Sequence, residues 1–470
     1  MFCNFYIAFC FLALPIEGSW VQQGADIDGA VADGFFGASV SMSVDGSRLA
    51  IGAHYAENAN GMSYAGQVRV YEFQSCEWVQ LGEDIDGDDA YEYTGYSVSL
   101  NDAGSQLAIG AKNNDDGANN AGQTRVYEYQ LGSWTQVGAG IDGESADDYS
   151  GSSVSMSGVG SRIVIGAPMT DTGSGSNSGR VRIYENKSGT WEQVGNEIDG
   201  EAAGDESGSS VSISSDGSRV AIGSPNNHGD SGMKSGSVRV YELQNNVWTQ
   251  IGQDIDGEAK SDKSGDAIVL SADGSRLAIG AEGNDAIPNG HATGHVRVYE
   301  YKSNINTWVQ LGADIDGEKT GDYSGIVAMN ADGSRIAIGS RNHDDHDSSS
   351  DNNAYLSGHV RVFDFQPNSN SWVQVGTEID GEARNDKSGT SVSMSADGSI
   401  VAIGSPGHEQ WTGHVRVYKF EPQGNCIFRC SKLIQICNHI ECFTDIIFSC
   451  RFWHMNKFLI LQLETIGMYM

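Results

Sequence analysis

An acidic phrase recurs about every 57 residues along the chain, and its carboxylates are spaced closely enough to bind a cation. Three copies, each followed four residues later by one more aspartate, are Asp254, Asp256, Glu258 and Asp262; Asp314, Asp316, Glu318 and Asp322; and Glu378, Asp380, Glu382 and Asp386. Carboxylates at alternate positions around a glycine resemble the start of a calcium loop. Alternatively, the aspartates cap backbone N–H groups of a tight turn that an isoleucine anchors. Recurrence in every repeat favours capping, so we expect no required cofactor and keep calcium open as the alternative.

One arginine recurs at the same position of a predicted strand in every repeat. These arginines are Arg69, Arg125, Arg182, Arg239, Arg297, Arg361 and Arg416. Strand alternation places each on the opposite face from its flanking valines, and neighbouring sheets would cover both faces. A buried guanidinium needs a partner, so we predict a structural role in which each arginine pairs with a carboxylate of the acidic loops. A basic ligand-binding ring is the less favoured alternative, because the chain is so acidic.

A third group of candidates lies in the segments between the second and third predicted strands, which vary in length and sequence. The candidate contact residues are Tyr55, Tyr64, His343, Asp344, His346, Tyr355 and Trp411. Variable loops on a rigid scaffold commonly carry recognition, and aromatic side chains are typical contact residues. The aromatic residues would equally serve to shield the ends of the strands. The histidines and aspartates near residue 345 could ligate a metal, although a solvated loop is the favoured interpretation.

No set of catalytic residues emerges from the sequence. The chain has no GxSxG, HExxH or phosphate-binding GxxxxGK[ST] motif, and no histidine or cysteine recurs with a fixed partner. An enzyme working in a central channel would need acids or histidines on its innermost strands, where segments such as Ser153 to Met156 offer serine, valine and methionine. We therefore expect that the protein is not an enzyme.

The elements that must position these residues are repeats of four short strands. Seven tryptophans open the repeats, at positions Trp20, Trp78, Trp134, Trp191, Trp248, Trp308 and Trp372. Within each repeat, alternating segments such as 39–43 and 49–52 flank a tight-turn signal, and a second hairpin follows. Four-stranded antiparallel units repeated in this way predict an all-β, seven-bladed β-propeller over residues 20–424. Because one strand stands alone at the start and three stand at the end, the first strand should complete the last blade.

The repeat phrases resemble the FG-GAP family, the seven-bladed propeller at the N-terminus of integrin α chains. Phe36-Gly37 supplies the FG element, and Ile165-Gly166-Ala167-Pro168 is a full GAP element. This resemblance implies a propeller that displays variable loops for adhesion or scaffolding. Calcium-binding members carry a DxDxDGxxD loop, which here shrinks to Asp-Gly-Ser, as at 45–47, so calcium at the family's usual position is unsupported.

The composition and charge of the chain limit which partners it can bind and where it can act. The net charge is −34, which excludes nucleic acid as a natural partner and disfavours an anionic membrane surface. No stretch of about 18 apolar residues occurs, so direct membrane insertion is not expected. Residues 1–19 are either a signal peptide or an unstructured start, and residues 425–470 form a cysteine-rich tail that departs from the repeat. We expect an extracellular or cell-surface binding protein with a protein or glycan ligand; the alternative is a carbohydrate-binding, lectin-like propeller.

Overall fold

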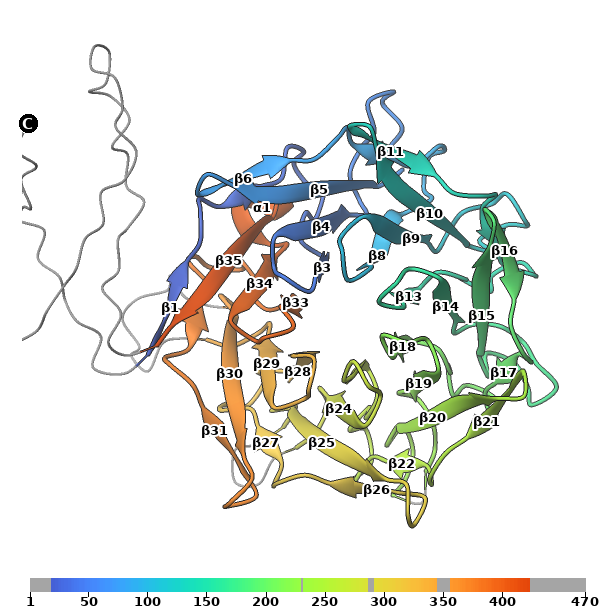
Figure 1. Cartoon of the computed structure of the whole chain (residues 1–470), viewed down its shortest axis with the longest axis vertical. Helices are drawn as coiled ribbons and strands as arrows, with labels where there is room; N and C mark the ends of the chain where they lie inside the picture. Colours follow the sequence, from blue (N-terminus) through green and yellow to red (C-terminus); the bar gives the residue numbers. More distant parts are fainter. Residues whose placement is uncertain (1–17, 230, 286–290, 345–355, 423–470) are drawn as a thin grey trace, which may run out of the picture. The chain divides into compact units, whose positions relative to one another are not determined.

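The computed structural model describes residues 18–229, 231–285, 291–344 and 356–422. In this part of the chain, seven antiparallel sheets are arranged in a ring around a central axis, as Figure 1 shows. This confirms the predicted all-β, seven-bladed propeller. The predictions for residues 1–17 and 423–470 concern segments outside the described residues. No helix among the described residues is long and apolar enough to cross a bilayer.

Each blade has four main strands, numbered outward from the axis, and one two-residue strand that pairs with its third strand. The innermost strands are β3 (Ser39–Met42), β8 (Thr94–Leu100), β13 (Ser153–Met156), β18 (Ser210–Ile213), β23 (Ala267–Leu270), β28 (Ser324–Met329) and β33 (Ser391–Met394). The second strands are β4 (Arg48–Ala53), β9 (Gln106–Ala111), β14 (Arg162–Ala167), β19 (Arg219–Ser224), β24 (Arg276–Ala281), β29 (Arg335–Ser340) and β34 (Ile400–Ser405). The third strands are β5 (Gln67–Gln74), β10 (Gln123–Gln130), β15 (Arg180–Lys187), β20 (Ser237–Gln244), β25 (His295–Lys302), β30 (His359–Gln366) and β35 (His414–Glu421).

The outermost strands each carry one of the repeated tryptophans. They are β6 (Glu77–Gln80), β11 (Ser133–Gln136), β16 (Thr190–Gln193), β21 (Val247–Gln250), β26 (Thr307–Gln310), β31 (Ser371–Gln374) and β1 (Ser19–Gln22). The two-residue strands are β2 (Ile27–Asp28), β7 (Ile85–Asp86), β12 (Ile141–Asp142), β17 (Ile198–Asp199), β22 (Ile255–Asp256), β27 (Ile315–Asp316) and β32 (Ile379–Asp380). One short helical segment, α1 (His408–Trp411), lies between β34 and β35. Blade 1 contains β3 to β6, and blade 7 contains β33 to β35 with β1.

The ring closes by pairing the first described strand with the last. Strand β1 runs antiparallel to β35, with Trp20 opposite Phe420. The indole N–H of Trp20 donates to the Val375 carbonyl at 2.9 Å, and each of the other six tryptophans donates in the same way to the backbone of the preceding blade. The closing blade is therefore held to its neighbour by the same contact as every other blade.

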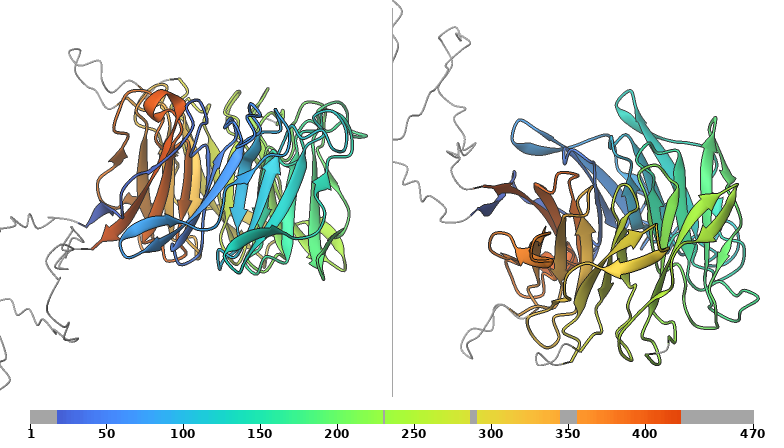
Figure 2. Two further views of the ribbon diagram at one scale, coloured as in Figure 1. Left: turned by 90° about the horizontal axis from the view of Figure 1, so that it is seen from above. Right: turned by 60° about the horizontal axis from the view of Figure 1, so that its bottom comes forward.

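The hydrophobic core lies between successive blades and not in the axis. The Ile, Val and Leu side chains of the second and third strands form this core. They are essentially unexposed, as Leu49, Ile51 and Ile163 show. One cluster joins Ile400 and Val415 of blade 7 to the core residues of blade 1, so the closing seam is packed like the others. Seen from two further directions in Figure 2, the blades run side by side around the ring.

Serines of the innermost strands link each blade to the next in most of the ring. In blade 1, Ser39 Oγ donates to the Gly95 carbonyl at 2.8 Å and Ser41 Oγ accepts from the Leu100 N–H at 2.9 Å. Blade 5 has Ala267 and Val269 at these positions, so its innermost strand cannot make the same bonds. These serine hydroxyls, which bond to the backbone of the neighbouring blade, are therefore part of the scaffold.

The acidic connections cap turns and hold the recurrent arginines. Asp262 Oδ2 accepts from the Ala259 N–H at 2.8 Å, and Asp322 and Asp386 accept from equivalent N–H groups. The arginine side chains are 4–13% exposed and pair as follows: Arg69 with Asp84, Arg125 with Asp88 and Glu92, Arg182 with Glu144, Arg239 with Glu201, Arg297 with Glu258, Arg361 with Glu318 and Arg416 with Glu382. Five of them also donate to an aspartate carbonyl of the preceding connection. The guanidinium groups thus stabilise the seams between blades, as strand alternation predicts.

Candidate functional site

A cavity of about 640 Å³ opens at the axis, on the face that carries the loops between second and third strands. Its lining comes from five successive blades: His54, Tyr55, Tyr93, Tyr96, Lys112, Asn113, Tyr149, Ser152, Pro168, Met169, Glu206, Ser209 and Asp266. Most of these residues immediately precede an innermost strand or immediately follow a second strand. A cavity lined in this way is the mouth of the central channel, and its volume lies in the range of small-molecule sites.

One ring of side chains at this mouth stands on a left-handed backbone. The residue two positions before the glycine that leads into each innermost strand has a positive φ of 52–58° in every blade. These residues are Phe35, Tyr93, Tyr149, Glu206, Lys263, Tyr323 and Lys387. The left-handed region is costly for residues with a side chain and is typically retained only where the surroundings impose it. Here the backbone conformation is the same in all seven blades while the side chain differs. The fold therefore does not require a particular side chain at this position.

Aromatic residues fill one sector of the mouth. Phe35 stacks on Trp411 with ring centroids 4.8 Å apart, and it contacts Tyr55 at 4.7 Å. Tyr55 in turn contacts Tyr64 at 5.5 Å and Tyr93 at 5.2 Å. Three of the predicted contact residues, Tyr55, Tyr64 and Trp411, therefore lie in one cluster that spans blades 7, 1 and 2. We call this group, with Tyr91, the aromatic sector.

Charged groups fill the adjoining part of the mouth. The Lys112 ammonium lies 3.7 Å from the centroid of the Tyr96 ring, a cation–π contact. In blades 5 and 6, Glu282 is held by Arg341 at 2.5 Å and by Lys263 at 3.5 Å. Burial, followed by the neighbouring Glu282 carboxylate, raises the pKa of Asp266 to about 6. We call Lys263, Asp266, Glu282 and Arg341 the charged sector; its Asp266 can hold a proton near neutral pH.

His54 lies within the aromatic sector and is only 9% exposed. Its ring contacts those of Tyr55 at 4.4 Å and Tyr96 at 5.2 Å. Burial, and secondarily the positive charge of Lys112, lowers the pKa of His54 to about 3. The imidazole is therefore neutral at physiological pH.

The remaining predicted contact residues lie elsewhere or outside the described part of the chain. His343 is buried at 3% exposure below the loop surface, and Asp344 accepts from the Leu356 N–H at 2.5 Å. Neither joins the aromatic sector. His346 and Tyr355 lie outside the described residues.

The carboxylates proposed for calcium do not converge within their own connections. Asp254 accepts from Gln250, Glu258 contacts Arg297, and Asp262 caps a backbone N–H. Among the described residues, every group of at least three potential metal ligands includes a histidine. Calcium in these loops stays a prediction, while the contacts that are present favour the capping role.

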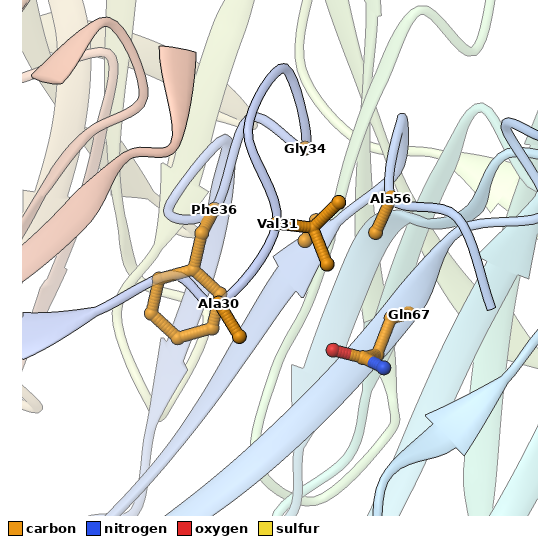
Figure 3. A pocket seen from close by; sticks show the side chains of 7 residues that line it. Ala30, Val31, Gly34, Phe36, Ala56 and Gln67 are labelled. Carbon is orange, nitrogen blue, oxygen red and sulfur yellow. The ribbon is translucent and has the colours of Figure 1, made fainter. Parts of the chain in front are cut away.

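A second, much smaller pocket lies in blade 1. Figure 3 shows Val31, Ala56 and Gln67 around it, below the connection that contains Gly34. Its volume is about 10 Å³, which is room for a single water at most. This pocket is therefore too small for a ligand larger than a water molecule.

The sequence interpretation missed most of the cavity lining. Tyr93, Tyr149 and Asp266 adjoin the repeated glycine, where they look like ordinary variants of the FG element. The signal that could have found them is variation itself, because neighbouring positions are nearly constant in all seven repeats. A position that changes from aromatic to acidic to basic on a constant backbone is available for chemistry.

No protein-family model matches the chain, and no curated protein sequence matches it. Among solved structures, it is similar to the hydrazine synthase of Kuenenia stuttgartiensis, with a TM-score of 0.52 and 15% identity over 82% of this chain and 96% of that chain. It is similar to a putative 6-phosphogluconolactonase of Bacteroides uniformis, with a TM-score of 0.50 and 13% identity over 74% of this chain and 86% of that one. A periplasmic gluconolactonase of Pseudomonas aeruginosa aligns with a TM-score of 0.49 and 14% identity, over 79% and 98% of the two chains.

These comparisons show the fold and correct one expectation. At such low identity they establish a propeller and nothing finer, and no family match supports FG-GAP repeats or integrins specifically. The expectation that the protein is not an enzyme is contradicted, because solved structures of this architecture that resemble it carry enzyme names, so the fold gives no ground for excluding an enzymatic activity. That expectation rested on missing catalytic motifs and on the residues of the innermost strands, whereas two acidic residues, Glu206 and Asp266, lie beside those strands in the lining of the channel mouth.

Proposed function

We propose that this propeller binds a carbohydrate at the mouth of its central channel. The observation that carries the proposal is one cavity whose lining combines tyrosine rings, two of them from the aromatic sector, with polar side chains. A sugar ring has apolar C–H faces, which pack on aromatic rings, and hydroxyl edges, which need donors and acceptors. The mouth offers both: Tyr93 and Tyr149 supply ring faces, and Asn113, Ser152 and Glu206 supply polar groups.

The proposal is supported by how the fold gathers aromatic residues that are irregularly placed in the sequence. Residues that are far apart in the sequence, such as Phe35 and Trp411, stack directly. The rings are also attached to a rigid scaffold, which lowers the entropic cost of ordering them around a ligand. A net charge of −34 favours neutral or basic ligands over acidic glycans.

On this proposal the protein acts outside the cell or at the cell surface, where glycans are displayed. The adhesion-type role that the FG-GAP resemblance implies would use the same face with a protein ligand. Its contact residues would be the exposed tyrosines Tyr64 and Tyr91, which are 40% and 58% exposed. Calcium is not required by either version.

The charged sector favours a second candidate function, acid–base chemistry on the bound ligand. Asp266, with its raised pKa, lies beside Glu282, so the pair can hold one proton between two carboxylates. A carboxyl group that is protonated near neutral pH can act as a general acid. Loss of turnover in Asp266→Asn, with ligand binding retained, would support this role.

A glycan array probed with the full chain tests the primary proposal. Tyr93→Lys and Tyr149→Glu are matched variants, because Lys263 and Glu206 occupy the same left-handed position in other blades. We expect each variant to lose about tenfold or more in affinity for the glycan that binds the wild type. Leu131→Ala, at a fully exposed position of the β10–β11 hairpin, serves as the control. Absence of any bound glycan, or unchanged binding by both variants, would refute the proposal.

A further inference from the structure

Blades 6 and 7 each contain a pair of histidines at equivalent positions, and all of these except His408 are buried. The first of each pair, His343 or His408, follows the second strand by three residues, and the other, His359 or His414, opens the third strand. The two rings are stacked, with centroids 3.8 Å apart and planes 19° apart in blade 6, and 4.0 Å and 21° in blade 7. The same arrangement is thus built twice from the same backbone.

Carboxylates of the acidic connections complete both groups. Asp322 Oδ2 lies 3.2 Å from His343 Nδ1, and Asp386 Oδ1 lies 3.0 Å from His408 Nδ1. In blade 6, ligand atoms of Glu318, His343 and His359 all lie within 4.8 Å of one another. In blade 7, the same holds for Asp386, His408 and His414.

The inner histidines lack partners. His359 and His414 are 0% exposed, and neither ring nitrogen of either residue makes a hydrogen bond. Glu378 lies 3.5 Å from His359 Nδ1, which is too far for a good hydrogen bond. Leaving a buried polar group unsatisfied costs about 1–3 kcal/mol, so two such groups at equivalent positions call for an explanation.

Other blades have different residues at the positions of the histidine pair. In blades 2 and 4, the residue equivalent to His408 is an asparagine, and its amide donates to the buried carboxylate: Asn114 to Glu92 at 2.7 Å, and Asn227 to Asp205 at 3.1 Å. The third strands there begin with Gln123 and Ser237. An amide therefore satisfies the carboxylate, and the paired imidazoles of blades 6 and 7 add something that the fold does not require.

We propose that blades 6 and 7 each bind one divalent transition metal ion of the Zn²⁺ class through their histidine pair and a carboxylate. Neutral imidazole and carboxylate are ligands that Zn²⁺ takes in tetrahedral sites, whereas Ca²⁺ and Mg²⁺ prefer oxygen ligands alone. Imidazole binds a metal through a lone pair in the plane of its ring. The stacked rings must therefore tilt to direct both lone pairs at one ion. His408, at 18% exposure, provides a route from solvent in blade 7.

Titration calorimetry of the chelator-treated full chain with ZnCl₂ at pH 7, with thiols alkylated to remove cysteine binding, tests the proposal. The variants exchange residues between blades so that folding is retained: His408→Asn with His414→Gln, and His343→Asn with His359→Gln. We expect each double variant to lower the stoichiometry by about one Zn²⁺ per chain, and the quadruple variant by about two. Thermal melts without metal check that the variants fold.

His291→Ala is the matched control, because His291 is 93% exposed and its Nδ1 lies 3.0 Å from Asp285. It should leave Zn²⁺ binding unchanged. The proposal is overturned if the quadruple variant binds as much Zn²⁺ as the wild type, or if His291→Ala lowers binding as much as the paired substitutions do.

Discussion

Blades 1 to 3 and blades 5 to 7 share one backbone plan and differ in what they place on it. In blades 1 to 3 the innermost serines link neighbouring blades, and the channel mouth is rich in aromatic residues. In blades 5 to 7 two of the innermost strands lose these serines, the mouth carries charge, and histidines open all three third strands. The difference teaches that the repeat builds the same rigid backbone in every blade. The side chains that could do chemistry lie only at the few positions where this backbone accepts different residues.

The largest contrast should appear at the tryptophans. Trp308, in blade 5, is 2% exposed and donates to the Ile251 carbonyl at 3.1 Å, whereas Trp134, in blade 2, is only half-buried. Trp308→Ala should lower the free energy of unfolding by about 3–5 kcal/mol, and Trp134→Ala by less. Urea unfolding followed by circular dichroism measures both. Equal losses would mean that the burial of the indole does not set how much each tryptophan stabilises its seam.

A smaller effect should separate the aromatic sector from the rest when pH falls. His54 has a pKa of about 3 in the folded chain and about 6.5 when unfolded, so below pH 6.5 only the unfolded chain takes up its proton. The stability that His54 contributes is therefore lost as pH falls, by about 2 kcal/mol at pH 5. His54→Phe should remove this part of the pH dependence between pH 7 and 5. Parallel stability curves for wild type and variant would contradict the assignment.

Ligand binding can be used to test the two sectors against each other. Tyr93→Lys transfers a residue of the charged half into the aromatic half, and Lys263→Tyr does the reverse on the same left-handed backbone. The first should weaken glycan binding by about tenfold, and the second should leave it unchanged or strengthen it. Affinities from titration calorimetry decide the matter. If both exchanges weaken binding equally, the ligand contacts the whole ring and not one sector.

The smallest effect concerns the innermost strands. Ser153 Oγ donates to the Gly208 carbonyl at 2.7 Å, so Ser153→Ala should cost about 1 kcal/mol. Ala267 occupies the equivalent position in blade 5. The segment of the following blade that faces it, at the start of the innermost strand of blade 6, is one residue shorter than in the other blades. Ala267→Ser should therefore recover little stability. A gain equal to the loss at Ser153 would show that the seams are interchangeable.

The sequence predicts the fold well because its signals are local and are repeated seven times. Alternation in 39–43, the Asp45-Gly46 turn and the lone strand at Trp20 each depend on neighbouring residues or on counting. The site was predicted only in part. Tyr55, Tyr64 and Trp411 stand out in variable loops, but only closure of the ring brings Trp411 of blade 7 against Phe35 of blade 1.

The histidine pairs and the acidic pair were missed for the same physical reason. His343 meets its carboxylates through a connection from the preceding blade, and Asp266 meets Glu282 across two strands. No short sequence motif joins the two partners, because a strand or a hairpin separates them along the chain. The expectation that the protein is not an enzyme relied on known motifs and on the innermost strands, and it did not consider the residues that flank those strands.

The pairing of β1 with β35 has a consequence for synthesis. On the ribosome, blades 1 to 6 can form in order, but blade 7 lacks its outer edge until the polypeptide emerges beyond Glu421 and returns to residues made hundreds of steps earlier. The segment from Ser19 to Gln22 must therefore remain without its partner strand until the end of translation. A circular permutant that begins at any blade connection would synthesise every blade from one continuous segment. It should fold into the same seven-bladed propeller.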